Sequence, residues 1–328
     1  MRALVLHGPY DLRLEDIPCP EPSEGQVLLK VHRAGICNSS DLHMLRGVSR
    51  FTFPYTFGHE ACGSVVAANG PVPDNADPLE KGQRVAYWFS LGAFAEYVLL
   101  DWPDVAISPI PDTISDEEGP TVELLCACLR SLCAILPEVP AAGSRPLSGQ
   151  RVLILGQGPA GLIFLQLTKA FGASYVAVAD IIPARLDMAR DLGVDRTVNP
   201  NESSLEVAQE VDLVIDAMGN DLSADADSAA QALRLLCTGG KYLQFGLPTR
   251  PRIFHPRDLI YRGVSICAAH EPRVETRNIM RLAVEMAASD DVNLSVLVSH
   301  RVKLEEVPRA VRMIRDHRES VLKVIVEV

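Results

Sequence analysis

The chain has 328 residues, of which 48% are hydrophobic and 22% charged, and its mean hydropathy is +0.12. This length exceeds the roughly 100 to 200 residues of one domain and the composition is that of a well-cored protein, so we expect two domains and exclude a disordered or fibrous chain. The formal net charge of −11 repels phosphate backbones and anionic lipids, which excludes nucleic acid and membranes as expected partners.

The N-terminal segment lacks the apolar run of a signal peptide, and no segment offers the roughly 18 consecutive apolar residues of a membrane span, so we expect a cytoplasmic protein. The eight cysteines follow no disulfide-scaffold spacing, and none are spaced C-x-x-C, which argues against a structural zinc ribbon. Most of them are expected to be small core residues kept as thiols by a reducing compartment.

Residues 1–110 contain short apolar runs separated by turn residues, which is typical of a mostly β domain. Residues 116–136 then have helical apolar spacing with acidic residues at the start, and Ser115 is the expected N-cap of this helix. Residues 137–149 form an extended connection. The apolar runs of the first part are RALVLHG, GQVLLKVHRAGI, GSVVAANG, QRVAYWF and GAFAEYVLL.

From residue 151 onward, strand-like and helix-like segments alternate regularly, which predicts a parallel, doubly wound sheet. This region, 124–270, is expected to be the second domain. The last residues return to mixed character. Strands are expected at 151–156, 175–180, 211–219, 241–246 and 320–328, and helices at 158–172, 182–193, 227–240, 277–289 and 304–317.

Three glycines, Gly156, Gly158 and Gly161, have G-x-G-x-x-G spacing after a predicted strand and at the start of a predicted helix that includes Pro159. This setting is typical of dinucleotide binding. The first glycine allows a tight turn, the second leaves room for a pyrophosphate, and the third allows close packing of helix on strand. The N–H groups at the start of the helix then face the phosphates.

Asp180 follows Gly156 by 24 residues at the end of the next predicted strand. A carboxylate there accepts hydrogen bonds from an adenosine ribose and repels a 2′-phosphate, so NAD is expected rather than NADP. The alternative interpretation is a tight turn followed by an exposed aspartate. Arg185 has two interpretations, a contact to the adenosine half or a solvated helix charge. Gly219 and Gly246 end the later strands, at the sheet edge where a nicotinamide would lie.

Four residues of the first part, Cys37, His59, Glu60 and Glu123, are candidates for a reactive centre. Thiolate, imidazole and carboxylate are the ligands of a catalytic zinc, which takes about three protein ligands and leaves one position open. Because these residues lie far apart in the sequence, spacing alone leaves open the alternative of a packed cysteine and a core histidine.

Five segments, in this order and spacing, resemble the zinc-dependent medium-chain alcohol and polyol dehydrogenases. They are AGICNSSDLH, GHEACGSVVAANG, GAFAEYVLL, TVELL and VLILGQGPAG. The resemblance covers nearly the whole chain and implies an α/β protein with two domains. A GroES-like, mostly β catalytic domain would comprise 1–123 and 271–328, and a Rossmann domain 124–270.

The resemblance also implies roles for the candidate ligands. Cys37 corresponds to the thiolate ligand, His59 to the imidazole ligand, and Glu60 to a carboxylate that either ligates or steps away. Glu123 corresponds to the carboxylate of the sorbitol dehydrogenase branch, where the ethanol-oxidising branch has cysteine, and this favours polyols or sugar-like alcohols. A carboxylate is harder than a thiolate and leaves the metal a stronger Lewis acid.

The chain departs from the family pattern in three places. It has only YWFSL where most zinc members carry a cysteine-rich lobe, so one catalytic zinc and no structural zinc is expected. The segment from Cys37 to Asp41 is one residue longer than in the family, which leaves the proton-relay hydroxyl open between Ser39 and Ser40, and we favour Ser40. The proline that usually follows Glu123 is a leucine.

The sequence therefore predicts an enzyme that transfers hydride between a secondary alcohol and NAD. Zinc would lower the pKa of the alcohol, Ser40 and His43 would relay its proton, and Asp41 would orient His59. The alternative for His43 is an exposed helix histidine. Rival functions are a zinc-free quinone or enoyl reductase of the same fold, and a non-catalytic NAD-binding sensor or structural protein. A homodimer or homotetramer is expected, and the expected pocket-lining residues are Tyr55, Trp88, Phe89 and His270.

Overall fold

The computed structural model describes residues 1–48, 51–205, 209–219, 226–248, 252, 254–268, 273–289, 291–316 and 320–328. The chain divides into two compact units. The first unit comprises Met1–Cys126 and Pro272–Val328, and the second comprises Ala127–Glu271. The sequence-based boundary after residue 123 and this division after Cys126 both fall within one helix, α2 (Thr121–Cys133).

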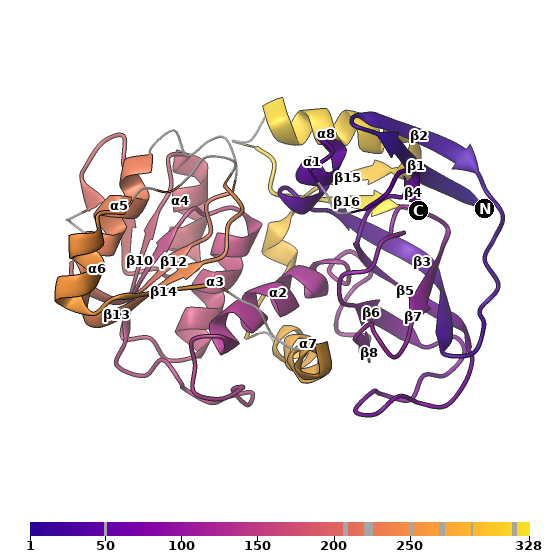
Figure 1. Ribbon diagram of the computed structural model, residues 1–328, viewed down its shortest axis with the longest axis horizontal. Coiled ribbons are helices and arrows are strands. Elements are labelled where there is room, and N and C mark those ends of the chain that lie inside the picture. The colour runs from indigo at the N-terminus through magenta and orange to yellow at the C-terminus, as the bar shows by residue number, and fades with distance from the viewer. Residues whose placement is uncertain are drawn as a thin grey trace. The chain divides into compact units, whose positions relative to one another are not determined.

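The first unit is built mainly of strands (Figure 1). A three-stranded sheet has the order β2-β1-β4, and a seven-stranded sheet has the order β15-β16-β3-β5-β6-β8 with β7 also paired to β3. The strands are β1 (Arg2–Gly8), β2 (Asp11–Asp16), β3 (Gln26–Ile36), β4 (Tyr55–Thr56), β5 (Glu60–Ala68), β6 (Arg84–Tyr87), β7 (Tyr97–Asp101), β8 (Ile107–Pro109), β15 (Val298–Lys303) and β16 (Lys323–Glu327). The helices are α1 (Ser40–Leu45), the first part of α2, α7 (Arg273–Ala288) and α8 (Val307–Asp316), with 3₁₀ turns at Ser295–Leu297 and Leu304–Glu306.

One apolar core joins the two ends of the chain in this unit. Helix α8 buries Val307, Ala310 and Ile314, which recur at the spacing of one helix face, against residues of β1, β3 and β5. Strand β16 pairs antiparallel with the end of β3. The C-terminal segment is therefore part of the first unit, and it lies beside the residues that follow β3.

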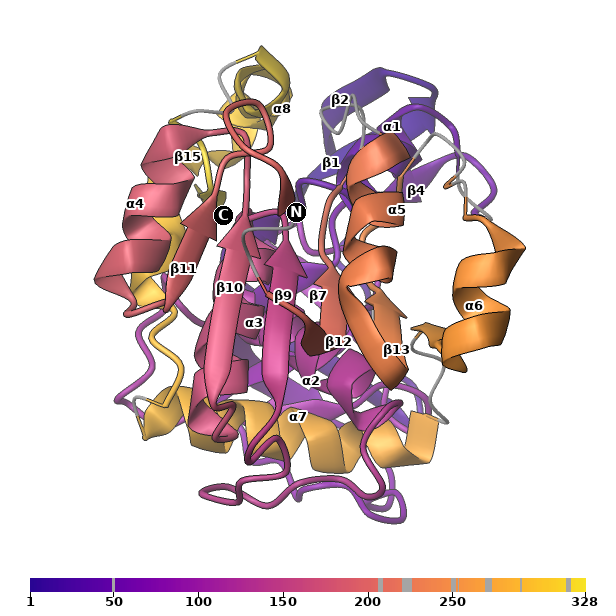
Figure 2. The same cartoon turned by 90° about the vertical axis from the view of Figure 1, so that its left-hand side faces the viewer.

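The second unit is a parallel six-stranded sheet with the order β11-β10-β9-β12-β13-β14, which Figure 2 views nearly face-on. The order reverses between β9 and β12, as in a doubly wound nucleotide-binding sheet. The α/β fold class expected from the sequence is confirmed. The strands are β9 (Arg151–Leu155), β10 (Tyr175–Ala179), β11 (Arg196–Val198), β12 (Val211–Asp216), β13 (Leu236–Gln244) and β14 (Ser265–Ala268), and the helices are α3 (Pro159–Ala170), α4 (Pro183–Asp191), α5 (Ala226–Leu235) and α6 (Pro256–Arg262).

The start of α2 differs from the sequence prediction. Ser115 caps a separate turn, since its Oγ accepts from the Glu118 N–H at 3.3 Å while a Glu118 oxygen accepts from the Ser115 N–H at 2.9 Å. Helix α2 begins only at Thr121, after Gly119 and Pro120. The expectation that Ser115 caps α2 was therefore wrong, because a helix that began there would hold Pro120 in its interior, where proline lacks an N–H and clashes with the preceding turn.

Candidate metal and dinucleotide sites

Three of the four predicted metal ligands come together at one end of the β3–β5 pair. Gly35 pairs with Glu60 in this antiparallel ladder, so Cys37, just beyond β3, meets His59, just before β5. One ligand atom from each of Cys37, His59 and Glu60 lies within 4.8 Å of the other two. Glycine is required at position 35, because a Cβ there would lie 2.5 Å from Glu60 Oε2. The pairing register of β3 and β5 thus brings a thiol, an imidazole and a carboxylate together.

Asp41 forms hydrogen bonds with two of these residues. One of its carboxylate oxygens accepts from the Cys37 N–H at 2.8 Å, and the other lies 3.0 Å from His59 Nδ1. Because a carboxylate only accepts, Nδ1 carries the proton and Nε2 is the nitrogen left for a metal. Burial opposes a charged imidazole, but the Asp41 charge and hydrogen bond and the Cys37 sulfur outweigh it and raise the pKa of His59.

The third ligand, Glu60, carries a buried ion pair. Lys323 Nζ lies 2.9 and 2.6 Å from the two oxygens of Glu60 and 3.4 Å from the Ile36 carbonyl oxygen. The lysine side chain is 1% exposed and the glutamate 0%. Burial lowers the pKa of Lys323, but the charges of Glu60, Cys37 and Glu123 and the hydrogen bond to Glu60 together outweigh burial and raise it, so the lysine is a cation. Lys323 was not predicted as a site residue, although a lysine within the apolar run VLKVIVEV is a visible signal in the sequence.

Glu123 lies in the first turn of α2 and is 4% exposed. It is not part of the three-residue cluster, but it is within electrostatic range of His59 and Glu60. Burial is the main cause that raises the pKa of Glu123 to about 7, and the Glu60 charge adds to it. Glu123 is therefore a buried carboxyl group at the border of the cluster.

The two candidate relay serines differ in their surroundings. Ser40 begins α1, and its N–H donates to Cys37 Sγ at 3.4 Å, an interaction that favours the thiolate. The Ser39 hydroxyl is buried and has no hydrogen-bond partner within the described ranges. His43 is half-buried on α1, one turn beyond Ser39.

Among the expected lining residues, Phe89 contacts the cluster. Its ring centroid lies 4.6 Å from that of His59, with the planes at 42°. Tyr55 instead stacks on Phe53 at 5.5 Å. The backbone N–H of Trp88 donates to Ala106 at 2.8 Å. His270 lies outside the described residues.

In the second unit, the glycine-rich turn lies between β9 and α3. Gly156 has a positive φ of 84°, which glycine adopts without strain. A Cβ on Gly161 would lie 1.8 Å from the Gly156 carbonyl oxygen, so strand and helix are in close contact there. Of the described part of the chain, a Cβ on Gly158 would meet only Arg185, at 3.9 Å, which leaves room around it. Helix α3 begins at Pro159 with its N-terminus at this turn.

Asp180 fixes this turn to the next strand. Its carboxylate accepts from the N–H groups of Gln157 at 2.6 Å and Ile182 at 2.9 Å, and Arg185 lies 3.9 Å away. The bond to Gln157 was not predicted and has no local signal in the sequence, because Gln157 follows β9 and Asp180 follows β10.

Gly219 and Gly246 follow β12 and β13 near Met218. A Cβ on Gly246 would lie 2.0 Å from the Met218 carbonyl oxygen, and a Cβ on Gly156 would lie 3.2 Å from Met218 N. Among the residues that the structure describes, no atom lies within 4 Å of a Cβ built on Gly219. The structure thus brings the Gly156 and Gly246 turns together at the carboxyl edge of the sheet.

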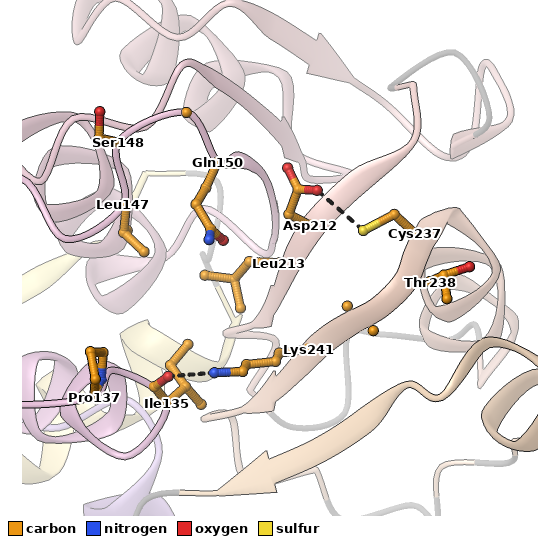
Figure 3. A pocket seen from close by; sticks show the side chains of 13 residues that line it. Ile135, Pro137, Leu147, Ser148, Gln150, Asp212, Leu213, Cys237, Thr238 and Lys241 are labelled. Atoms are coloured by element: carbon orange, nitrogen blue, oxygen red, sulfur yellow. Dashed lines mark hydrogen bonds between the residues drawn. The ribbon is translucent and has the colours of Figure 1, made fainter.

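A cavity of about 490 Å³ lies at the opposite edge of the same sheet (Figure 3). It is lined by residues at the amino ends of β9, β12 and β13, among them Asp212, Cys237 and Lys241. Cys237 Sγ donates to Asp212 at 3.1 Å, and Lys241 Nζ donates to the Ile135 carbonyl at 2.6 Å. Since parallel strands place the glycine turn at their carboxyl ends, this cavity is separate from the dinucleotide edge.

Within the described residues, no helix has the length and apolar character to span a membrane.

Comparison with known proteins gives two family matches. Residues 23–112 match the alcohol dehydrogenase GroES-like domain, and residues 159–289 match the zinc-binding dehydrogenase family. The chain is 30% identical to sorbitol dehydrogenase of Ovis aries, over 94% of this chain and 91% of that protein. It is 26% identical to sorbitol dehydrogenase of Bacillus subtilis, over 99% and 97%. The structure of 2R,3R-butanediol dehydrogenase from Bacillus subtilis superimposes with a TM-score of 0.82 at 23% identity, covering 100% and 99% of the chains.

Proposed function

The chain belongs to the zinc-dependent medium-chain dehydrogenase family, of the sorbitol dehydrogenase type, and from this premise we propose that it oxidises a polyol-like secondary alcohol with NAD at one catalytic zinc. The observation that carries the proposal is the cluster of Cys37, His59 and Glu60, whose ligand atoms lie within 4.8 Å of one another. A thiolate, an imidazole and a carboxylate are donors that suit zinc.

The surroundings of the cluster fit a divalent cation. Because Asp41 bonds to Nδ1, Nε2 is the His59 nitrogen available to a metal, and the Ser40 N–H stabilises the thiolate of Cys37. When bound, zinc supplies Lewis-acid polarisation of an alcohol oxygen. Cys37, His59 and Glu60 would hold the ion, and Glu123 is the further carboxylate we propose for this site.

Lys323 affects how Glu60 can act as a metal ligand. The lysine contacts both oxygens, so Glu60 is shared between an ammonium and the metal position. We propose that this competition allows the carboxylate to ligate or to step away.

The proton of the alcohol needs a path through the chain's own side chains. We propose Ser40 as the relay hydroxyl and His43 as the group that passes the proton to solvent, with Ser39 as the alternative hydroxyl. An imidazole can accept a proton at one ring nitrogen and release one from the other, which suits such a relay.

The polyol class is supported by two features. By the family resemblance, Glu123 corresponds to the position where the ethanol-oxidising branch has a thiolate, and a carboxylate there would favour an oxygen-rich substrate. The sorbitol dehydrogenases that the chain resembles act on a polyol by name.

The cofactor proposal rests on the second unit. Gly156, Gly158, Pro159 and Gly161 would receive the pyrophosphate at the start of α3, and Gly219 and Gly246 would border the nicotinamide half. The Asp180 carboxylate opposes a 2′-phosphate, which supports NAD over NADP, and Arg185 would flank the adenosine.

A second copy of the chain is the proposed partner besides the small-molecule alcohol. Strand β14 is at the edge of its sheet, and the exposed apolar side chains near it are Ile260 at 75%, Tyr261 at 80% and Ile266 at 42%. Unpaired edge groups with apolar neighbours favour pairing with a second sheet. We also propose a cytoplasmic location, where the eight free cysteines remain thiols.

The test combines metal analysis with NADH formation across polyols, cyclitols, amino-sugar alcohols and simple alcohols. We expect one zinc per chain, turnover with a polyol-like substrate, and loss of both metal and turnover in Cys37→Ala. Cys19→Ala is the matched control, because Cys19 is exposed and remote from the cluster in sequence. Metal-free turnover would favour the reductase alternative, and NAD binding without turnover would favour the sensor alternative.

A further inference from the structure

A Ser–His–Asp arrangement lies in the first unit, formed by none of the residues assigned above. Ser64 Oγ lies 2.9 Å from His32 Nε2, and His32 Nδ1 lies 3.1 Å from Asp116 Oδ2. Arg84 donates to the other oxygen of Asp116 at 3.0 and 2.7 Å. A hydroxyl, an imidazole and a carboxylate in this order are the parts of a nucleophile activated by an oriented base.

A β-bulge directs His32 toward Ser64. Along β3 and β5, Val31 pairs with Gly63 and Arg33 pairs with Cys62, so His32 is an extra residue on β3. Bulges re-aim a side chain out of the regular alternation of a strand. The imidazole therefore owes its place to a specific backbone irregularity.

Strand β6 holds Asp116 in place through Arg84. Ser64 pairs directly with Arg84, so both side chains are on one face of the sheet. Arg84 also donates to the carbonyl oxygens of Pro111 at 3.3 Å and Ile114 at 2.8 Å. The arginine thus ties the segment that carries Asp116 to the sheet.

The charges give His32 the tautomer that a base requires. Burial raises the pKa of Asp116, but the bonds and charges of Arg84 and His32 outweigh burial and lower it, so Asp116 is a carboxylate at neutral pH. A carboxylate accepts from Nδ1–H, and Nε2 of neutral His32 then has a lone pair for the Ser64 hydroxyl. The side chains of His32 and Asp116 are 26% and 40% exposed, so solvent and a small reagent reach the group.

We propose that Ser64 is a nucleophile that is acylated by small, neutral carboxylic esters with good leaving groups, with His32 as the base and Asp116 as the orienting residue. A bond forms between Ser64 Oγ and the acyl carbon as the hydroxyl proton moves to His32 Nε2. The ester C–O bond then breaks, and the leaving alcohol takes that proton. Water attacks the acyl group by the same route and releases the carboxylic acid, so the step involves no net oxidation or reduction.

The position of Ser64 sets the expected rate. The residue lies between two paired strands, opposite Lys30 and Arg84, rather than at an exposed turn with a helix N-terminus behind it. Stabilisation of a developing oxyanion is therefore weaker than in a dedicated esterase. We expect slow turnover and a long-lived acyl adduct.

The chain contains a matched internal control. Ser299 also contacts a histidine, since its Oγ lies 2.9 Å from His300 Nδ1. Its hydroxyl, however, donates to the Lys323 carbonyl at 3.1 Å and accepts from the Leu322 N–H at 2.9 Å. A serine held in this way has its proton committed to a carbonyl, so we expect Ser299 to remain unmodified.

The experiment treats the zinc-loaded protein with p-nitrophenyl acetate and a fluorophosphonate, and locates adducts by intact mass and peptide mapping. We expect one adduct, at Ser64, which Ser64→Ala removes. His32→Gln and Asp116→Asn are each expected to slow labelling about 100-fold or more, the contribution of a positioned base. Far-ultraviolet circular dichroism and NADH-forming turnover of each variant report whether the fold is kept.

The adduct distinguishes this proposal from ester hydrolysis at the metal. Labelling of Ser64 is expected to persist in Cys37→Ala, whatever the fate of dehydrogenase activity. No adduct at Ser64, equal labelling of Ser299, or a labelling rate unchanged in both His32→Gln and Asp116→Asn would each overturn the proposal.

Discussion

The ion pair between Lys323 and Glu60 gives the sharpest stability prediction. Both side chains are buried, and the ammonium contacts both carboxylate oxygens at 2.9 and 2.6 Å. Lys323→Met keeps the length and apolar stem of the side chain while it removes the charge. Glu60 is then a buried carboxylate that has lost the ammonium bonded to both of its oxygens.

The expected loss of unfolding free energy follows from the removal of this counter-charge. Removing one partner of a buried ion pair destabilises a protein by about 3–5 kcal/mol, because the other charge keeps its desolvation cost without compensation. At about 2–4 °C per kcal/mol for a cooperative folding unit of about 150–250 residues, the apparent Tm of the unit that holds this ion pair would fall by roughly 6–20 °C in the metal-free protein. The double variant Lys323→Met with Glu60→Gln removes both charges, so it should lose less than the sum of the single losses, with a coupling energy of about 2–3 kcal/mol.

Zinc provides an independent check on the same reasoning. A bound cation would give Glu60 a new counter-charge, so zinc should stabilise Lys323→Met more than it stabilises the unmodified protein. The assay is urea unfolding followed by circular dichroism, with and without zinc. Lys30→Met, an exposed lysine on β3, is the control and should change stability by less than about 0.5 kcal/mol.

Two results would refute this account. One is a loss of less than about 1 kcal/mol in metal-free Lys323→Met, which would mean that Glu60 finds another way to be solvated or neutralised. The other is an additive double variant, which would mean that the two side chains do not stabilise one another.

Three further predictions concern the relay, the cofactor and a buried thiol. Ser40→Ala should lower kcat about 100-fold with zinc content unchanged, and the same loss in Ser39→Ala instead would transfer the relay role to that residue. Asp180→Ala removes the acceptor of two backbone N–H groups and should weaken NAD about 10- to 100-fold while reducing discrimination against NADP in binding titrations. Burial raises the pKa of Cys62 to about 12 from its usual 9.0, so its thiol form contributes stability that is complete below pH 9.0 and is lost as pH rises toward 12. Iodoacetamide at about pH 8 should therefore alkylate exposed Cys19 and leave Cys62 unmodified, and rapid native labelling of Cys62 would contradict its burial.

Features that depend on neighbours along the chain were predictable from the amino-acid sequence. The alternation of apolar strands and amphipathic helices after residue 151 predicted a doubly wound sheet, because the periods of strand and helix are local properties. The spacing of Gly156, Gly158 and Gly161 likewise predicted a strand–turn–helix, and the structure has one there. The chemistry of Cys37, His59 and Glu60 suggested ligands, but their meeting depended on the fold.

Which distant residues share a site depends on how the strands pair in the folded protein. The register of β3 against β5 brings Cys37 to His59, and the pairing of β16 with β3 delivers Lys323 to Glu60 across 263 positions of the chain. A one-residue bulge turns His32 toward Ser64, and no local pattern specifies it. Strand register, bulges and the contacts of the C-terminal segment are set by the free energy of the whole core, so residues close in space need carry no signal that relates them in sequence.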